Sequence, residues 1–233
     1  MWLDANMIKQ ADGTNVTNWY DLSGYASHVT QATSSMQPVF KTGIINGLPI
    51  VRFDGVDDYL TTSNSSVLAM LNNVSGATAI AVGKWVQRAT QQALVCVMRG
   101  NTTAPRFQLN VAGGSYLYAL SGTRADADTN AASYTTKTSG TNAIYTVAWN
   151  YSSATVSQWV NGVINVNGAS FGTSGSTSNT NSSAINIGAY TTPQTTFAQG
   201  DFGEVLIYNR VLTSAELTFI HNYLSKKWGI ALV

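Results

Sequence analysis

Short stretches that alternate apolar and polar residues recur along most of this chain, and they constrain its fold more than any other feature. Residues 106–111, for example, place Phe107, Leu109 and Val111 on one face, because successive side chains of a strand point to opposite sides. The expected strands are residues 79–86, 93–98, 106–111, 116–120, 144–151, 156–160, 184–189 and 203–208. No helical segments alternate with them as a parallel α/β fold requires. The pattern therefore predicts an all-β, antiparallel sandwich.

Turn signals and composition support the same fold. Asn161-Gly162 separates two apolar pairs and is the strongest short hairpin signal in the chain. Charged residues make up 10% of the sequence, against about 25% in a typical globular protein. Thr, Ser and Asn occur 28, 23 and 20 times. We therefore expect a surface solvated by hydroxyl and amide groups and a chain richer in strands and turns than in helices.

One helix is well specified, near the C-terminus. Thr213 and Glu216 have the spacing of a capping box, in which each side chain satisfies the other residue's backbone N–H. Gly229 suits the left-handed position that ends a helix. An apolar stripe at helical spacing consists of Leu217, Ile220, Leu224 and Trp228. We expect this stripe to face the protein core.

Charge and composition exclude several classes of partner. The net charge is +1 and the longest basic run is Lys226-Lys227, so we expect no nucleic-acid binding. No apolar stretch reaches the ~20 residues of a membrane span. Cys96 is the only cysteine, which rules out an intrachain disulfide. The first residues lack a basic region followed by an apolar one. The protein therefore either stays in the cell or leaves it without the secretory route, for instance by lysis, and we expect an extracellular location reached without a secretory signal peptide.

Several motifs resemble those of a known family. They include Asn18 to Gly24 (NWYDLSG), Val51 to Leu60 (VRFDGVDDYL) and Gly203 to Thr213 (GEVLIYNRVLT). Together they are similar to the laminin-G-like, concanavalin A-like lectin/glucanase domains of bacteriophage and bacterial surface proteins. The resemblance extends from the first residues to the last helix. It implies one jelly-roll domain over residues 1–233, of a kind that more often serves recognition or structure than catalysis.

Glycoside hydrolysis is the enzymatic alternative that this resemblance raises. It requires two carboxylates about 5–10 Å apart. The only glutamates are Glu204 and Glu216, and Glu216 belongs to the capping box. Asp201 and Glu204 are three residues apart, which places them on opposite faces of a regular strand, and the adjacent Asp57 and Asp58 meet the same objection. We therefore predict a protein without catalytic activity.

No cofactor is expected, and calcium is the ion that the sequence leaves open. Residues 126–130 contain the D-x-D-x-N spacing of an oxygen-rich loop, but Ala131 and Lys137 stand where a calcium loop requires Gly and an acid. A second acidic group lies near residue 55. The candidate ligands are Asp126, Asp128, Asn130, Asp54, Asp57 and Asp58. The structural alternative is a solvated loop for the first group and a turn for the second.

Sugar recognition requires an exposed aromatic ring beside amide and hydroxyl groups. Tyr134 and Tyr190 lie in polar surroundings and are the preferred candidates. Trp85 and Trp159 lie in expected strands, where a ring serves either as a platform or as part of the core.

Three functional hypotheses follow. The first is a non-catalytic virion protein of a bacteriophage, a capsid decoration or fibre module, whose partners are other virion or capsid proteins or host-surface glycans. The second is a carbohydrate-binding lectin domain of an exported bacterial protein. The third is a glucanase-like hydrolase that depends on Glu204. Assembly as a homo-oligomer is compatible with all three.

Overall fold

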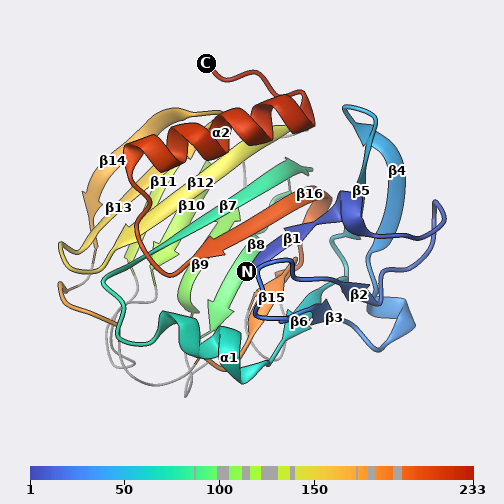
Figure 1. Cartoon of the computed structure of the whole chain (residues 1–233), viewed down its shortest axis with the longest axis horizontal. Coiled ribbons are helices and arrows are strands. Elements are labelled where there is room, and N and C mark those ends of the chain that lie inside the picture. Colours follow the sequence, from blue (N-terminus) through green and yellow to red (C-terminus); the bar gives the residue numbers. More distant parts are fainter. Residues whose placement is uncertain are drawn as a thin grey trace.

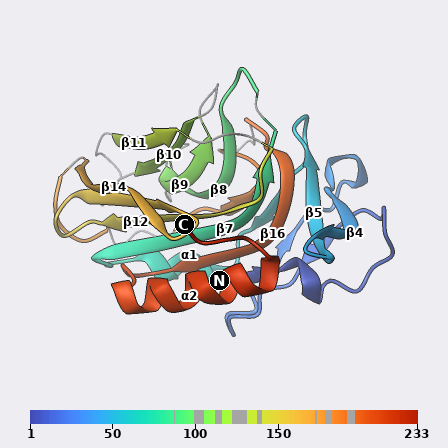
Figure 2. The same ribbon diagram turned by 90° about the horizontal axis from the view of Figure 1, so that it is seen from above.

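The computed structural model describes residues 1–86, 88–98, 105–111, 116–121, 131–136, 140–171, 173–177, 182–190 and 196–233. For residues 105, 116–121 and 131–136 it describes the backbone alone. Two antiparallel sheets are packed face to face (Figures 1 and 2). We call them sheet A and sheet B.

Sheet A contains the long strands that carry the C-terminal helix. Its order is β14 (Val163–Ser170), β13 (Thr155–Val160), β12 (Ala143–Asn150), β7 (Gly76–Trp85), β16 (Gln199–Tyr208), β5 (Leu48–Asp54) and β4 (Val39–Ile45). The short strand β1 (Trp2–Asp4) also pairs with β16. β16 therefore has two neighbours on one side, β5 along its first half and β1 along its second.

Sheet B forms the other layer. Its order is β11 (Ala131–Thr136), β10 (Tyr116–Ser121), β9 (Pro105–Val111), β8 (Gln92–Met98), β15 (Ile185–Ile187), β6 (Leu60–Thr62), β3 (Val29–Thr30) and β2 (Asn18–Trp19). The inner faces of both sheets form one large hydrophobic cluster, in which Phe107 of sheet B stacks on Trp149 of sheet A with ring centroids 4.4 Å apart. The antiparallel sandwich predicted from the alternation is confirmed.

The C-terminal helix α2 (Ser214–Trp228) lies across the outer face of sheet A (Figure 2). The capping box of Thr213 and Glu216 is present, and Gly229 ends the helix with a φ of +63°. Leu217, Leu224 and Trp228 are buried as expected, whereas Ile220 is only partly buried. The other helical segments are short: η1 (Ala5–Met7), η2 (Ser34–Met36), α1 (Ser65–Leu68) and η3 (Ala69–Leu71).

The predicted Asn161-Gly162 turn is confirmed, and a second turn has the same geometry. Asn161 and Gly162 have φ values of +51° and +82° between β13 and β14, which are the signs of a type I′ hairpin turn. Asn46 and Gly47 repeat this geometry between β4 and β5.

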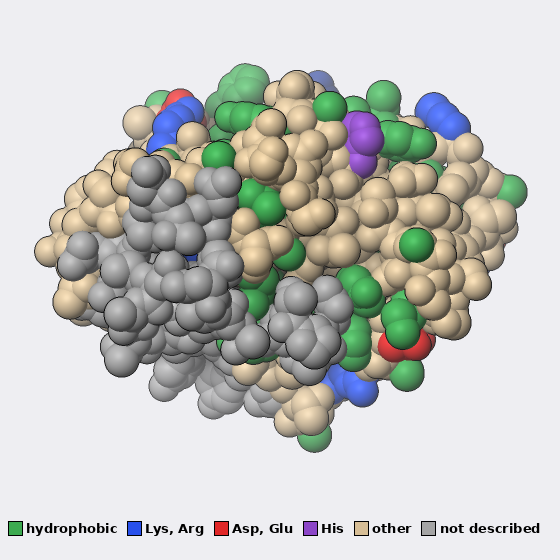
Figure 3. Space-filling view, turned by 90° about the horizontal axis from the view of Figure 1, so that it is seen from below, with side chains coloured by type: hydrophobic (Ala, Val, Ile, Leu, Met, Phe, Trp, Pro, Cys, Tyr) green, Lys and Arg blue, Asp and Glu red, His purple; other side chains and the backbone are tan. Residues whose placement is uncertain are grey.

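The described surface visible in Figure 3 is poor in charge, as the composition predicts. Figure 3 shows one end of the sandwich, on which few acidic or basic side chains interrupt polar and apolar ones. No helix in the described part of the chain has the length and apolar character needed to cross a membrane.

Candidate functional site: an aromatic groove beside the C-terminal helix

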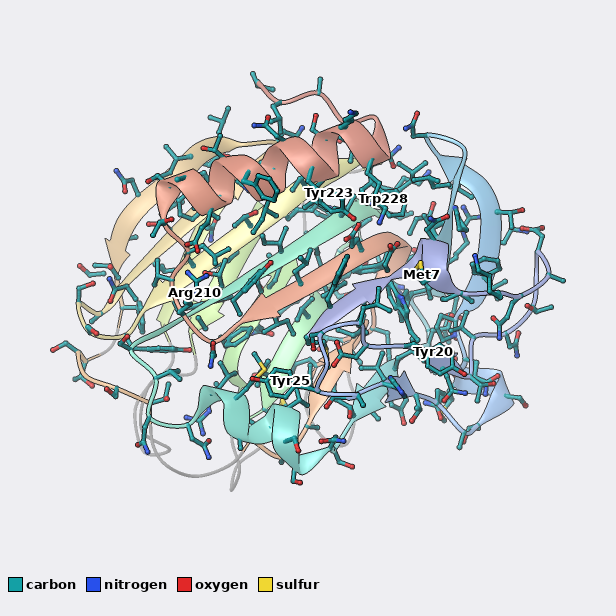
Figure 4. All side chains as sticks on the ribbon, in the orientation of Figure 1. Met7, Tyr20, Tyr25, Arg210, Tyr223 and Trp228 are labelled. Atoms are coloured by element: carbon teal, nitrogen blue, oxygen red, sulfur yellow. The ribbon has the colours of Figure 1, made fainter. Side chains whose placement is uncertain are left out.

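A hollow of about 450 Å³ opens on the outer face of sheet A, between α2 and the loop that carries Tyr25. Figure 4 shows Tyr223 on the helix and Tyr25 on the opposite side of β16 and β1. We call this hollow the aromatic groove. Its aromatic lining residues are Trp2, Tyr25, Tyr208, Phe219 and Tyr223. Its lining therefore combines segments that are far apart in the sequence.

The floor of the groove consists of two paired strands. Trp2 of β1 lies opposite Leu206 of β16, so both side chains are on the same face of the sheet. Tyr208 follows Leu206 by two residues and lies on the same face. Leu3 and Ile207 alternate with these residues and belong to the inner core. The period-two pattern of the strands thus divides their apolar residues between core and groove.

One wall of the groove is the exposed side of α2. Phe219 and Tyr223 are four residues apart and therefore neighbours on the helix surface. They are 75% and 40% exposed, on the side away from the buried Leu217 and Leu224. An aromatic pair on the solvent side of an otherwise polar helix surface is not required by the core.

The opposite wall is a loop that a buried carboxylate holds in place. Asp21 is 7% exposed and accepts hydrogen bonds from the backbone N–H groups of Trp2 (2.8 Å), Ser23 (3.0 Å) and Ser27 (3.2 Å), and from the Ser23 hydroxyl (2.9 Å). Burial acts to raise the pKa of Asp21, but these hydrogen bonds outweigh it and lower the pKa below its usual value. The loop that presents Tyr25 is therefore ordered by its own side chains.

Three polar groups in the groove are available to a ligand. The hydroxyls of Tyr25 and Tyr208 and the side-chain amide of Asn209 make no hydrogen bond within the described part of the chain. Tyr25 and Asn209 are exposed and Tyr208 is partly buried. Rings that offer apolar faces beside unengaged hydroxyl and amide groups match the chemistry of a saccharide, which has both apolar faces and hydroxyl edges.

Glu204 lies at the end of the groove nearest the C-terminus of α2 and is fully buried. Its carboxylate accepts hydrogen bonds from Trp2 Nε1 (2.7 Å), Trp228 Nε1 (2.8 Å) and Lys227 Nζ (2.7 Å). Lys227 Nζ also contacts Asp4 Oδ2 at 2.6 Å. Burial acts to lower the pKa of Lys227, but its hydrogen bonds to Asp4 and Glu204 raise it above the ordinary value. Glu204 therefore fixes α2 to strands β1 and β16.

The expectation that Asp201 and Glu204 point to opposite faces is wrong. In the pairing of β16 with β7, Asp201 lies opposite Lys84 and Glu204 lies opposite Val82, with an irregularity between Phe202 and Glu204. Lys84 and Val82 are two residues apart and share a face, so their partners share it as well. The extra residue is a β-bulge, which a spacing argument for a regular strand does not anticipate.

A glycine occupies this bulge for a steric reason. A Cβ on Gly203 would lie 2.6 Å from the Trp228 ring.

Although the carboxylates of Asp201 and Glu204 share a face, each already has a cation: Asp201 pairs with Arg52 (2.6 Å) and Lys84 (3.6 Å), and Glu204 with Lys227. Neither has the arrangement of a general acid that is free to protonate a substrate.

The second candidate site, residues 54–58, we call the acidic loop. Carboxylate oxygens of Asp54, Asp57 and Asp58 lie within 4.8 Å of one another, so the expectation that Asp57 and Asp58 point apart is also wrong. Both follow the end of β5 and are not in a strand. Burial, followed by the charges of Asp54 and Asp57, raises the pKa of Asp58 to about 6.

The acidic loop uses its carboxylates for its own backbone. Asp54 Oδ1 accepts the N–H of Val56 at 2.7 Å, and Asp58 Oδ2 accepts the N–H of Asp54 at 2.9 Å. These hydrogen bonds are those of a turn, which the sequence analysis gave as the alternative to a calcium site at these residues. A hollow of about 370 Å³ lies beside the loop and is lined by the Asp201 ion pairs as well as by Asp54 and Asp58.

The remaining sequence candidates that the structure describes lie in different parts of the sandwich. Trp85 is 2% exposed and packs on Tyr145 in the core with centroids 4.2 Å apart, so it is not available as a sugar platform. Trp159 is partly buried against the cluster beneath α2. Tyr190 is partly buried against Cys96 and its neighbours. Tyr134 lies in β11, and its side chain is outside the described residues, as are Asp126, Asp128 and Asn130 entirely.

Sequence reasoning missed the residues of the aromatic groove. A signal was present: Phe219 and Tyr223 lie on the side of the predicted helix away from its apolar stripe. Trp2 and Tyr208 gave no comparable signal, because each belongs to a strand whose outward face cannot be assigned from the sequence.

Comparison with known families and structures gives a consistent result. A family model described as the concanavalin A-like lectin/glucanases superfamily matches residues 54–218, which confirms the resemblance noted in the sequence. No curated protein sequence matched the chain.

Among solved structures, a Trypanosoma rangeli sialidase in complex with sialic acid aligns with a TM-score of 0.66 at 16% identity, over 97% of this chain and 32% of its own. The binding domain of botulinum neurotoxin serotype G aligns with a TM-score of 0.65 at 11% identity, over 98% and 53%. The CBM40 domain of a Ruminococcus gnavus sialidase bound to α2,3-sialyllactose aligns with a TM-score of 0.54 at 11% identity, over 94% and 99%. The chain thus spans about a third of the first relative and about half of the second. These similarities show the fold.

Proposed function

Because this chain belongs to the concanavalin A-like lectin/glucanase superfamily, we propose that it is a non-catalytic glycan-binding domain whose ligand occupies the aromatic groove. The observation that carries the proposal is the lining of the groove, where aromatic rings from β1, β16, α2 and the Tyr25 loop surround unengaged hydroxyl and amide groups. Solved structures of similar fold include a domain bound to a sialylated sugar, which supports a glycan as the class of ligand.

The shape of the groove also supports this assignment. Saccharides bind proteins by stacking their apolar faces on aromatic rings, and their hydroxyls then reach polar groups at the ring edges. Tyr25 and Phe219 both line the groove and are both exposed, so each offers a ring face to a sugar bound there. The ordered loop around Asp21 holds Tyr25 in place before binding, which reduces the entropy lost on association.

The non-catalytic part of the proposal rests on the two carboxylates that share a face. Glu204 and Asp201 are buried and paired with cations, and Glu204 fixes the helix. Assays for reducing-end release from a panel of polysaccharides are therefore expected to show no turnover. Release of reducing ends by the purified chain would overturn this part of the proposal.

A matched pair of tyrosine variants tests the groove. Tyr25 and Tyr20 are 43% and 51% exposed and five residues apart, but only Tyr25 lines the groove. We expect Tyr25→Ala to weaken binding of a glycan selected on an array by about tenfold or more, and Tyr20→Ala to leave it within about twofold. Equal effects of the two substitutions, or none, would contradict a binding site in the groove.

A virion-surface role is a second proposal. It is supported by the charge-poor, hydroxyl-rich composition and by the large exposed side chain of Phe219, which suit a module displayed to a partner. The same groove then serves attachment to host-surface glycans. Mass spectrometry of purified virions from the source is expected to find this chain. Its absence from the particles would leave an exported lectin domain as the context.

A further inference from the structure

We propose that the aromatic groove selects neutral saccharides and rejects sialylated ones. This inference rests on the proposed glycan-binding function and adds the class of ligand. It follows from the charges that surround the groove and from the partners those charges already have.

The side-chain charge beneath the groove is predominantly negative. The floor and the end of the groove carry three buried or nearly buried carboxylates, Asp4, Asp21 and Glu204. Two cations lie among them. The Lys227 ammonium already contacts Asp4 and Glu204 at 2.6 and 2.7 Å, and the buried N-terminal ammonium of Met1 interacts with Asp21 and donates a hydrogen bond to the Ile207 carbonyl at 3.0 Å. Buried charges are poorly screened by salt, so their field extends into the groove.

The cation on the outer rim is also engaged. Arg210 lies beyond Phe219, in an adjoining hollow that shares Tyr208, Phe219 and Ile220 with the groove. Its guanidinium makes a two-point pair with Glu216, with both N–O distances at 2.7 Å. Glu216 in turn caps α2, so moving Arg210 toward a ligand would break a pair that includes the helix cap.

Within the described part of the chain no lysine or arginine side chain lines the groove, and the Met1 ammonium already has the Ile207 carbonyl as its partner. The polar groups that it offers, the Tyr25 and Tyr208 hydroxyls and the Asn209 amide, are uncharged. A neutral sugar finds rings and hydrogen-bonding partners in this setting. A sialic acid carboxylate finds neutral groups and an unfavourable field, and juxtaposed like charges are strongly disfavoured at an interface.

The test is a glycan array that carries each α2,3-sialylated glycan beside its desialylated parent, together with neutral β-glucan oligosaccharides. We expect the chain to bind a neutral member, and to bind it at least about tenfold more tightly than the sialylated partner in titration calorimetry. Equal or tighter binding of the sialylated partner would overturn the selectivity and leave the proposed function standing. Binding of no glycan by the folded protein would overturn the proposed function itself.

A charge variant makes the test specific to the groove. Asn209 lines the groove, and Asn209→Lys introduces an ammonium with no carboxylate assigned to it. We expect this variant to gain at least about fivefold in affinity for α2,3-sialyllactose relative to the unmodified chain. The matched control is Gln10→Lys at an exposed position outside the groove, which adds the same charge and is expected to give no gain. Equal gains in both variants would contradict the assignment of the selectivity to the groove.

Discussion

The aromatic groove and the acidic loop border opposite ends of strand β16. They differ in which of their polar groups already have partners within the protein. In the groove, the buried carboxylates Asp21 and Glu204 are satisfied by the protein, and the Tyr25 and Tyr208 hydroxyls at the surface are left unengaged. In the acidic loop, Asp58 is at least as buried as Asp21 but has other acids as neighbours.

The difference teaches where binding capacity is to be expected. The acidic loop gathers side chains that are typical metal ligands, but two of their carboxylate oxygens accept hydrogen bonds from the backbone of the same turn. The groove has only one signal in the sequence, the pair Phe219 and Tyr223 on the solvent side of α2, but it presents aromatic rings and unengaged hydroxyls on an ordered scaffold. Removing a charged side chain should therefore lower the free energy of unfolding beside the groove and raise it in the acidic loop.

The largest expected effect is the removal of Lys227. Lys227→Ala leaves the Glu204 and Asp4 carboxylates buried without their cation, and we expect a loss of about 3–5 kcal/mol in the free energy of unfolding, by analogy with other buried pairs broken on one side. The matched control is Lys226→Ala, at an exposed position on the same turn of α2, with an expected change within about 0.5 kcal/mol. Urea denaturation measures both, and similar losses would contradict the role given to Lys227.

A smaller effect of opposite sign is expected in the acidic loop. The folded protein holds the Asp58 proton more tightly than the unfolded chain, where the pKa is near 3.8, so stability falls as pH rises from about 4 to about 6. Asp58→Asn keeps an oxygen for the Asp54 N–H and removes the buried charge. We expect it to stabilise the protein by about 1–2 kcal/mol at pH 8 and to have little effect at pH 4.

The comparison measurement for Asp58→Asn is thermal unfolding at the two pH values in the presence of a chelator. A variant that is less stable than the unmodified chain at pH 8 would show that the Asp58 carboxylate is needed in its charged form. Such a result would point to a bound cation in place of the self-satisfied turn described here.

The smallest expected effect is that of calcium. Two carboxylate oxygens of the acidic loop already accept backbone N–H groups, so we expect the melting temperature to change by less than about 1 °C when millimolar calcium is added after chelation. A rise of several degrees that is lost in Asp58→Asn would assign a calcium site to this loop. A rise that persists in this variant would place the ion elsewhere in the chain.

The fold was largely predictable because its signals are local. Period-two alternation, the Asn161-Gly162 turn and the Thr213–Glu216 capping box each act over a few residues, and the structure contains all three. β11 was not expected, since residues 131–136 (AASYTT) carry too little apolar alternation to predict a strand.

The site was not predictable because it depends on long-range placement. Trp2 and Glu204 are 202 residues apart and meet through the pairing of β1 with β16. The bulge at Gly203 reverses the face that simple spacing assigns to Glu204 relative to Asp201. Trp85 was a candidate sugar platform, but it faces the core. It is separated from the core residues Ala79 and Ala81 of β7 by an even number of residues, so all three side chains lie on the same face of the strand.

The central claim is that a saccharide binds between α2 and the Tyr25 loop. Amide chemical-shift mapping by NMR, with titration of the tightest-binding neutral glycan from the array, tests it directly. We predict saturable shifts at Ser23, Tyr25, Asn209 and Phe219, with residues 54–58 unaffected. Shifts confined to the acidic loop or to sheet B, with the groove residues unmoved, would contradict the claim.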